Sequence, residues 1–401
     1  GGFLTGSLGE IMAKHLPYEV VMMLYPQSWW FYSAVLGLFF VALPFSRYMH
    51  IFTEIPLIFL RRWSLRPTKE RKSYDNFEVE ACSRCGICID PCQLQLQLGI
   101  NDVQSVYFLR DRRYNMLQQK IANNCLMCGR CEQTCPVGIN LNTLRLNSRT
   151  SMRNIPNEGR YSYLRGLDRS EGEGQVGYFA GCMTLLTPNT MTSMQRIFEA
   201  AHEKVWWADK DGGVCCGRPL RLTGETDSAQ KMVDYNKALF AKHNITTLVT
   251  SCPICLRIFK EEYNLEGIEV LHHSEYILRL IRQGRLHIGY SAEQRFTYHD
   301  PCELGRGSGI YDEPRAVIEA VGQLLEPAHN RRNAFCCGSS VANTAINDRQ
   351  QFTIASKVAE ELDSTGADIV VTACPQCKRA ITRGSKRQVM DLSEVVAQNL
   401  R

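Results

Sequence analysis

The chain has 401 residues, of which 44% are hydrophobic and 18 are cysteines, and its formal net charge is +5. A chain of this length buries ordinary hydrophobic cores, so the cysteines are not needed as the disulfides that hold small secreted domains together. Adjacent cysteine pairs also fit disulfide geometry poorly. Much of the positive charge flanks an apolar N-terminal segment, so it gives no support to nucleic-acid binding.

The first predicted element is an apolar helix near the N-terminus. Residues 29–45 (WWFYSAVLGLFFVALPF) form a run of seventeen without charge, which at about 1.5 Å per residue is the short end of a bilayer span. Two tryptophans at one end and basic residues at the other are typical of a membrane helix followed by a cytoplasmic domain. The basic residues are Arg47, Arg61, Arg62, Arg66, Lys69, Arg71 and Lys72.

Two details qualify this membrane segment. Pro44 is expected to kink or end the helix, and a buried helix of a soluble protein is the alternative interpretation. Because the chain begins with Gly1 and without an initiator methionine, we expect residues 1–72 to be the end of a longer, cytochrome b-like membrane domain.

Two cysteine blocks follow, ACSRCGICIDPC and NCLMCGRCEQTCP, each with the two-two-three spacing of bacterial ferredoxins. In that pattern three close cysteines hold one [4Fe-4S] cubane and the fourth crosses to the other cluster. Zinc knuckles are the alternative, but they usually pair Cys-x-x-Cys units without a third cysteine in step. The spacing therefore assigns one cubane to Cys82, Cys85, Cys88 and Cys135, and the second to Cys125, Cys128, Cys131 and Cys92.

One position departs from the ferredoxin pattern. Pro136 follows Cys135 as that pattern expects, whereas Gln93 follows Cys92. Between the blocks, residues 94–121 (LQLQLGINDVQSVYFLRDRRYNMLQQKI) have apolar residues at three- and four-residue intervals, which predicts a helix there and a helical ferredoxin domain over residues 73–150. Residues 151–175 are rich in Arg, Ser, Glu and Gly and are predicted to form a linker.

The remaining ten cysteines form a pattern that occurs twice: one Cys, then Cys-Cys-Gly, then Cys-Pro-x-Cys. Matching cysteines are offset by 120 to 122 residues. Five thiols per copy indicate ligation of a soft metal, which we take to be iron. The first copy has Cys182, Cys215, Cys216, Cys252 and Cys255, and the second has Cys302, Cys336, Cys337, Cys374 and Cys377.

Each copy is predicted to be an α/β domain, over residues 176–289 and 290–401. Short apolar strands precede the single cysteine (VGYFAGC, RFTYHDPC) and the last pair (TTLVTSCPIC, ADIVVTACPQC), with helical stretches between them. Strands that alternate with helices predict an α/β sheet, with the thiolates along one rim. Gly217 and Gly338 are predicted to allow a turn close to the inorganic core, where a side chain would obstruct.

With these motifs in place, residues 74–401 resemble the CCG domains of the HdrB component of heterodisulfide reductase, fused behind a ferredoxin module as in the membrane-bound HdrD component. The resemblance implies that each set of five cysteines holds a noncubane [4Fe-4S] cluster. A second resemblance, of LPFSRYMHIFTEIP to the last helix end of the nitrate reductase gamma chain, implies that His50 ligates haem b. Tyr32 stands eighteen residues earlier, where that family has another haem histidine.

These features predict an iron–sulfur oxidoreductase of the inner cell membrane with its cluster domains on the cytoplasmic side. It would move electrons between a quinone or cytochrome b pool and a disulfide/thiol couple at the paired noncubane clusters, within a hetero-oligomeric complex. Two alternatives stay open. One is an electron relay that connects a flavoprotein, of the electron-transfer flavoprotein or hydroxy-acid dehydrogenase type, with the quinone pool, and the other is a zinc-stabilised scaffold. His299 is expected to be structural or to donate to a cluster sulfur.

Overall fold

The computed structural model describes residues 6, 9–11, 14–46, 48–63, 72–152, 170–210, 212, 214–341, 343 and 345–401. The chain forms two compact units, residues 1–84 and residues 85–401. Arg47, Arg66, Lys69 and Arg71 of the predicted basic flank, and most of the predicted linker, lie outside the described residues.

The first unit contains a long apolar helix, α2 (Tyr18–Ala42). The apolar stretch extends to Phe45, has a mean hydropathy of 1.5 and has no buried residue in its most apolar window, so by length and composition it can cross a membrane. It ends where predicted, because Pro44 lies in the 3₁₀ turn η1 (Leu43–Phe45) that follows α2. Two further helices described in this unit are α3 (Met49–Arg62) and α4 (Lys72–Glu80).

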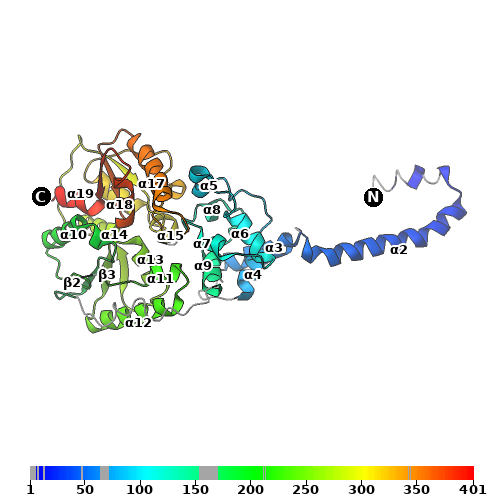
Figure 1. The fold of residues 1–401 in the computed structure, drawn as a ribbon, viewed down its shortest axis with the longest axis horizontal. Coiled ribbons are helices and arrows are strands. Elements are labelled where there is room, and N and C mark those ends of the chain that lie inside the picture. Colours follow the sequence, from blue (N-terminus) through cyan, green and yellow to red (C-terminus); the bar gives the residue numbers. More distant parts are fainter. Residues whose placement is uncertain are drawn as a thin grey trace. The chain divides into compact units, whose positions relative to one another are not determined.

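The second unit begins with a group of short helices in place of the continuous helix that the apolar spacing between the two ferredoxin blocks suggested. Gly99 ends the first of them with a left-handed φ of 68°, a conformation that glycine adopts without steric cost. The helices, grouped in Figure 1, are α5 (Gln93–Leu98), α6 (Ser105–Arg113), α7 (Gln119–Asn123), α8 (Arg130–Thr134) and α9 (Leu141–Ser151).

The two cysteine repeats fold alike, as the offset of their motifs predicted. Each has a four-stranded parallel sheet, in the orders β2-β1-β3-β4 and β6-β5-β7-β8. The first repeat runs β1 (Val176–Phe179), η3 (Thr184–Leu186), α10 (Pro188–Ala200), β2 (Val205–Trp207), α11 (Arg218–Leu222), α12 (Thr226–Lys242), β3 (Thr247–Thr250), α13 (Pro253–Glu261), β4 (Glu269–His272) and α14 (His273–Arg282).

The second repeat has the same succession of strands and helices. It runs β5 (Arg295–His299), α15 (Gly305–Ser308), α16 (Asp312–Glu319), β6 (Gln323–Leu324), η4 (Arg331–Asn333), α17 (Asp348–Asp363), β7 (Ile369–Thr372), α18 (Pro375–Thr382), β8 (Gln388–Asp391) and α19 (Leu392–Gln398). The tandem α/β architecture of the sequence prediction is confirmed.

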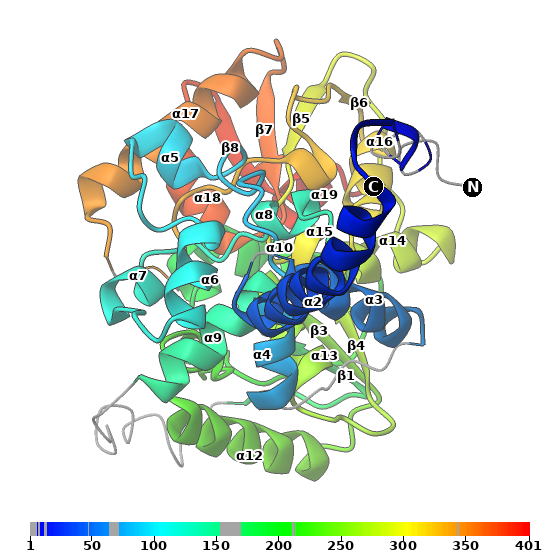
Figure 2. The same cartoon turned by 90° about the vertical axis from the view of Figure 1, so that its right-hand side faces the viewer.

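The two repeats share one hydrophobic core. Tyr178 and Met194 of the first repeat belong to the same buried cluster as Tyr298 and Val371 of the second. Helix α10 packs against α19, and α14 packs against α16, so the two sheets stand back to back across these helices (Figures 1 and 2). This shared core makes the relative position of the two cysteine sets a property of the fold.

Candidate functional site

The cysteines of each repeat come from three places on one edge of its sheet. In the first repeat, Cys182 follows β1 and Cys252 follows β3, and these strands are parallel neighbours, so their carboxyl ends lie at the same edge. Cys252 is also the N-cap of α13. The turn before α11 supplies Cys215 and Cys216. The predicted convergence on one rim therefore follows from the parallel sheet.

The five thiols of the first repeat lie together. Burial raises the pKa of the Cys182 thiol, and the neighbouring thiols of Cys216, Cys215 and Cys252 raise it further. The Cys255 thiol forms hydrogen bonds with Cys216 and Cys252, which raise its pKa well above the usual range. Four of the five are buried, and Cys182 is half-buried. Sequence spacing alone thus identified a set that the fold assembles.

Two residues of the first repeat that sequence reasoning missed support the turn before Cys182. Gly181 has a φ of +87°, and a Cβ there would lie 3.0 Å from the Cys255 Sγ. The buried Asp209 carboxylate accepts hydrogen bonds from the backbone N–H groups of Ala180 at 2.9 Å and Gly181 at 2.7 Å. Burial raises the pKa of Asp209 to about 7. Neither residue carries a sequence motif of its own.

The five cysteines of the second repeat line one cavity. Cys302, Cys336, Cys337, Cys374 and Cys377 all contribute to its wall, and its volume is about 30 Å³. The Cys302 and Cys336 sulfurs are 3.8 Å apart. Hydrogen bonds with Cys337 and Cys374 raise the pKa of Cys377 well above its usual range. Apolar side chains from elsewhere also line the cavity: Leu126 of the helical part, and Leu222 and Ile254 of the first repeat.

The glycines of the two Cys-Cys-Gly turns are required for a different reason from the one predicted. Gly217 and Gly338 have φ values of +85° and +80°. A Cβ on Gly217 would lie 3.0 Å from the Ala229 carbonyl of α12, and one on Gly338 would lie 2.7 Å from Ile354 of α17. The turns therefore pack against helices, and it is this packing, together with the left-handed backbone, that excludes a side chain.

Charged and polar side chains hold the second repeat around its cysteines. His299 is paired through Nδ1 with Thr372 Oγ1 at 3.3 Å and through Nε2 with the Phe335 carbonyl at 3.2 Å, so it is structural, and burial lowers its pKa to about 4. Asp300 forms two 2.8 Å hydrogen bonds with the Arg315 guanidinium. The His299 side chain therefore holds the backbone of Phe335, the residue before Cys336, and does not bind a cysteine sulfur.

An ion pair joins the two repeats beside their cysteines. Arg257, two residues after Cys255, contacts Glu303, which follows Cys302, at 3.0 Å. Burial would raise the pKa of Glu303, but the guanidinium groups of Arg257, Arg218 and Arg306 together outweigh burial and keep this carboxyl below its usual pKa. The two cysteine sets are thus tied by charge as well as by the shared core.

One of the two predicted ferredoxin sets is assembled in the second unit. Burial raises the pKa of the Cys92 thiol, with smaller contributions from Cys125 and Cys128. Burial and the same two neighbours raise the pKa of the Cys131 thiol well above its usual range. This thiol also accepts a hydrogen bond from Ser105 at 3.3 Å. Cys92 therefore lies with the three cysteines of the other block, as the crossing pattern requires.

The other predicted ferredoxin set is divided between the two units. Cys82 belongs to the first unit, and Cys85, Cys88 and Cys135 belong to the second. Its assignment to a cubane stays a prediction. His50 lies in α3, and its assignment to haem also stays a prediction. Among the described residues, no three His, Cys, Asp or Glu side chains are arranged for a single metal ion.

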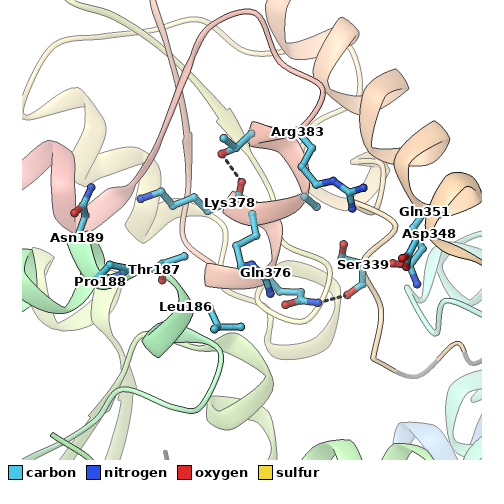
Figure 3. Close-up of a pocket in the computed structure, with 13 residues that line it drawn as sticks. Leu186, Thr187, Pro188, Asn189, Ser339, Asp348, Gln351, Gln376, Lys378 and Arg383 are labelled. Carbon is cyan, nitrogen blue, oxygen red and sulfur yellow. Dashed lines mark hydrogen bonds between the residues drawn. The ribbon is translucent and has the colours of Figure 1, made fainter. Parts of the chain in front are cut away.

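A larger pocket of about 620 Å³ opens beside the second cysteine set. Its wall contains Lys378 and Arg379 of α18, Arg383 directly after that helix, and residues 186–189 of the first repeat (Figure 3). Lys378 pairs with Glu394, whereas Arg383 lies 5.5 Å over the Phe352 ring.

Two residues line both this pocket and the cysteine cavity. They are Ser339 and Gln376, and the Gln376 amide donates to the Ser339 carbonyl at 3.1 Å (Figure 3). Gln376 stands between Cys374 and Cys377 in the chain. The pocket and the cysteine cavity therefore adjoin at this hydrogen-bonded pair of residues.

Comparison with known protein families matches both kinds of cysteine block. The CCG cysteine-rich domain matches residues 176–260 and 296–382, and the 4Fe-4S dicluster domain matches residues 78–139. The cysteines of the second unit thus lie in iron–sulfur and CCG domains, as the spacing predicted.

Two relatives cover most of the chain at low identity, and a third covers less than half of it. The HdrD component of the dihydromethanophenazine:CoB–CoM heterodisulfide reductase of Methanosarcina acetivorans is 26% identical over 83% of this chain and 97% of its own. The EtfAB:quinone oxidoreductase of Syntrophomonas wolfei is 22% identical over 94% of this chain and 68% of its own. A "Probable membrane-anchored ferredoxin" of Chromohalobacter salexigens is 31% identical over 45% of this chain and 29% of its own.

Among solved structures, a hypothetical protein from Helicobacter pylori aligns with 86% of this chain and 76% of its own, at a TM-score of 0.52 and 10% identity. A likeness at that identity concerns the fold alone. The domain matches and the relatives together place the chain among electron-transferring iron–sulfur proteins. The apolar α2 and the similarity to a membrane-anchored ferredoxin suggest membrane association.

Proposed function

Because the chain is an iron–sulfur protein with CCG domains, similar to the HdrD component of heterodisulfide reductase, we propose that it uses electrons from a membrane quinol to reduce a disulfide beside its second CCG domain. The observation that carries this proposal is the pair of adjoining cavities. All five cysteines of the second repeat line the inner one. Among the described residues, Ser339 and Gln376 alone are shared with a substrate-sized outer pocket.

The donor sets fit iron–sulfur clusters. Each repeat gathers five thiols, most of them buried, at the carboxyl edge of a sheet, and thiolates are the ligands that such clusters prefer. We propose the ten cysteines as ligands of two noncubane clusters. The eight ferredoxin cysteines would hold two cubanes, and when bound these groups supply one-electron steps between a quinol and the CCG domains. Haem at His50 belongs to the same proposal.

The proposed reaction balances with a quinol as reductant. Reduction of R–S–S–R′ breaks the sulfur–sulfur bond, takes up two electrons and two protons, and releases two thiols. Oxidation of one quinol to a quinone releases two electrons and two protons. The described side chains bind and orient the disulfide: α18 supplies positive charge to the outer pocket, and Gln376 stands at its inner end.

The charge of the outer pocket favours a disulfide that carries an anionic group. Arg379 and Arg383 are exposed within it, and Asp348 is an acidic residue of its wall, on α17. A pocket of about 620 Å³ is within the usual range for small-molecule sites. A carboxylate or phosphate held by the arginines would leave the rest of the molecule directed at Gln376 and the cysteine cavity.

The test uses the full chain in detergent with reduced viologen as electron donor. We expect reduction of dithiodiglycolate, an anionic disulfide, and of the neutral hydroxyethyl disulfide. Replacing both arginines, Arg379→Gln with Arg383→Gln, should raise the KM for dithiodiglycolate about tenfold, because charged hydrogen bonds are lost, without changing kcat. The KM for the neutral disulfide should not change.

Arg349→Gln is the matched control, because Arg349 is an exposed arginine of α17 that does not line the pocket. It should leave both KM values unchanged. If the purified chain accepts electrons from viologen and reduces no disulfide of either charge, the disulfide proposal is wrong.

A second function is favoured by one comparison. Similarity to an EtfAB:quinone oxidoreductase extends over 94% of this chain. The chain would then pass electrons between an electron-transfer flavoprotein and the quinone pool, without a small-molecule substrate of its own. Oxidation of a reduced electron-transfer flavoprotein by the purified chain, with a water-soluble quinone as acceptor, would support this relay.

A further inference from the structure

Gln93, the residue that departs from the ferredoxin pattern, reaches the second CCG domain. Its side chain is 1% exposed. The Gln93 Nε2 donates to the Cys336 carbonyl at 3.0 Å, and the Cys336 backbone N–H donates to the Gln93 Oε1 at 2.6 Å. The carboxamide therefore pairs with both backbone groups of one cysteine of the second repeat, much as a neighbouring β-strand would.

The two ends of this contact belong to different proposed clusters. Gln93 directly follows Cys92, which lies with Cys125 and Cys128 in a ferredoxin set. Cys336 lies with Cys302 in a CCG set. The Gln93 side chain thus links the chain next to Cys92, in the ferredoxin set, with the backbone of Cys336, in the CCG set. The link consists of two hydrogen bonds.

A second arrangement marks the same boundary. Cys128 of the ferredoxin set lies near Cys302. Burial raises the pKa of the Cys128 thiol and the Cys302 thiol raises it further, whereas the Arg306 guanidinium lowers it. The Arg306 guanidinium donates through Nε to the Cys128 carbonyl at 2.6 Å and through a terminal nitrogen to the Ala334 carbonyl at 2.7 Å. Arg306 of the second repeat therefore binds the backbone of the ferredoxin domain at Cys128, just as Gln93 of the ferredoxin domain binds the backbone of the second repeat at Cys336.

The packing around Gln93 also belongs to this boundary. Helix α5, which begins with Gln93, contacts α17 of the second repeat. Leu94 and Cys336 are members of one buried apolar cluster, which Cys92, Cys128 and Cys302 contact. A proline in place of Gln93 could not form the paired hydrogen bonds, because it has neither a donor nor a side-chain amide. The departure from the ferredoxin pattern is thus explained by a contact outside the ferredoxin domain.

We propose that Gln93 is a positioning residue that holds the Cys92 cubane against the second CCG cluster, so that electrons reach the tandem CCG domains through the second repeat. This inference rests on the proposed cluster ligation, but not on a disulfide being the substrate. The amide thereby contributes to the contact between the domains and to the order in which the two repeats are reduced.

The test compares Gln93→Met with Gln97→Leu in the full chain. The first variant keeps the side-chain length and removes both hydrogen bonds to Cys336. The second changes a half-buried glutamine on the same helix, whose Oε1 lies 3.3 Å from the Gln93 Nε2, and leaves the Cys336 pair in place. Iron and sulfide contents are measured first, and we expect them to match those of the unmodified chain in both variants.

The readout is electron arrival, without quinone or disulfide present. After mixing with reduced viologen, freeze-quenched samples are followed by electron spin resonance. The two CCG signals are assigned beforehand from Cys182→Ser and Cys302→Ser chains. In the unmodified chain and in Gln97→Leu we expect the second-repeat signal to change first. In Gln93→Met this step should be about tenfold slower, because two buried hydrogen bonds that hold the docked arrangement are lost.

Two results would overturn the inference: an unchanged rate in Gln93→Met at full iron content, or reduction of the first repeat before the second in the unmodified chain. If Gln93→Met loses iron, Gln93→Glu replaces it, because its carboxylate still accepts from the Cys336 N–H while it repels the Cys336 carbonyl. Its rate should then fall below those of the unmodified chain and of Gln97→Leu, and an unchanged rate would again contradict the inference. A chain that reduces no disulfide but shows these rates disproves the proposed substrate alone.

Discussion

The two repeats support their first cysteine with different residues. In the first, the Asp209 carboxylate accepts hydrogen bonds from the backbone N–H groups of Ala180 and Gly181. In the second, the position before Cys302 is Pro301, which has no N–H to donate, and Asp300 is instead bound by Arg315. Equivalent thiols are thus presented by unlike backbones, so the two proposed clusters have different surroundings.

Gly181 offers a test of how tightly the first set is packed. Gly181→Ala forces a Cβ to within 3.0 Å of the Cys255 sulfur at a φ of +87°, so we expect both backbone strain and displacement of a thiol. The chain should lose about a quarter of its iron, four atoms of roughly sixteen, and the spin-resonance signal of the first repeat.

Gly284→Ala is the control for this prediction. Its φ is +69° and a Cβ there would have no atom within 4 Å, so it introduces the backbone strain without the crowding. Iron content should stay complete. Equal iron loss in the two variants would show that strain, and not contact with Cys255, is responsible.

Among the secondary-structure elements, β5, α16 and the segment after β6 are joined by a buried ionic network. Arg315 of α16 binds Asp300 at the end of β5 and also Glu326, at 2.6 Å. Burial would lower the pKa of Arg315, but the two carboxylates raise it above its usual range. The turn that carries Cys302 therefore depends on a helix that contributes no cysteine.

Removing this guanidinium should destabilise the second repeat strongly. Arg315→Met leaves the Asp300 carboxylate, which is 3% exposed, without its main partner, and breaking a buried pair costs about 3–5 kcal/mol. Urea-induced unfolding, followed by loss of cluster absorbance without oxygen, measures the free energy.

The control is Arg295→Met, since Arg295, the first residue of β5, forms a surface pair with Asp368, the residue before β7. Solvent screens this pair, so its removal should leave the unfolding midpoint unchanged within error. Equal midpoints for the two variants would mean that the Arg315 network does not stabilise the fold.

At the scale of the whole molecule, the four proposed cluster sites predict a composition. The full chain, purified in detergent without oxygen, should contain about sixteen iron and sixteen sulfide, four of each per cluster. Zinc without sulfide would support the scaffold alternative. Cys92→Ser and Cys135→Ser should each remove about four irons, from opposite cubanes if the fourth cysteine of each block crosses.

The whole molecule also shows what a local pattern predicts well. The ferredoxin spacing predicted the ferredoxin domain, and the duplicated five-cysteine motif, with the strands and helices around it, predicted the two α/β repeats. These predictions succeeded because the cysteines of each set follow strand ends or helix starts, which a short stretch of sequence specifies. Pro44 likewise ended an apolar helix as expected. The continuous helix predicted between the ferredoxin blocks was wrong, because Gly99 ends α5 in a left-handed turn.

By itself, the sequence determined which thiols lie together in each repeat and around Cys92, since ligand spacing and strand periodicity act over a few residues at a time. Only the tertiary structure decided which sets adjoin. Gln93 and Cys336 are 243 residues apart, and Arg257 and Glu303 meet across two repeats. Such contacts arise when separate elements pack around a shared core, and no local pattern in the chain encodes their distance.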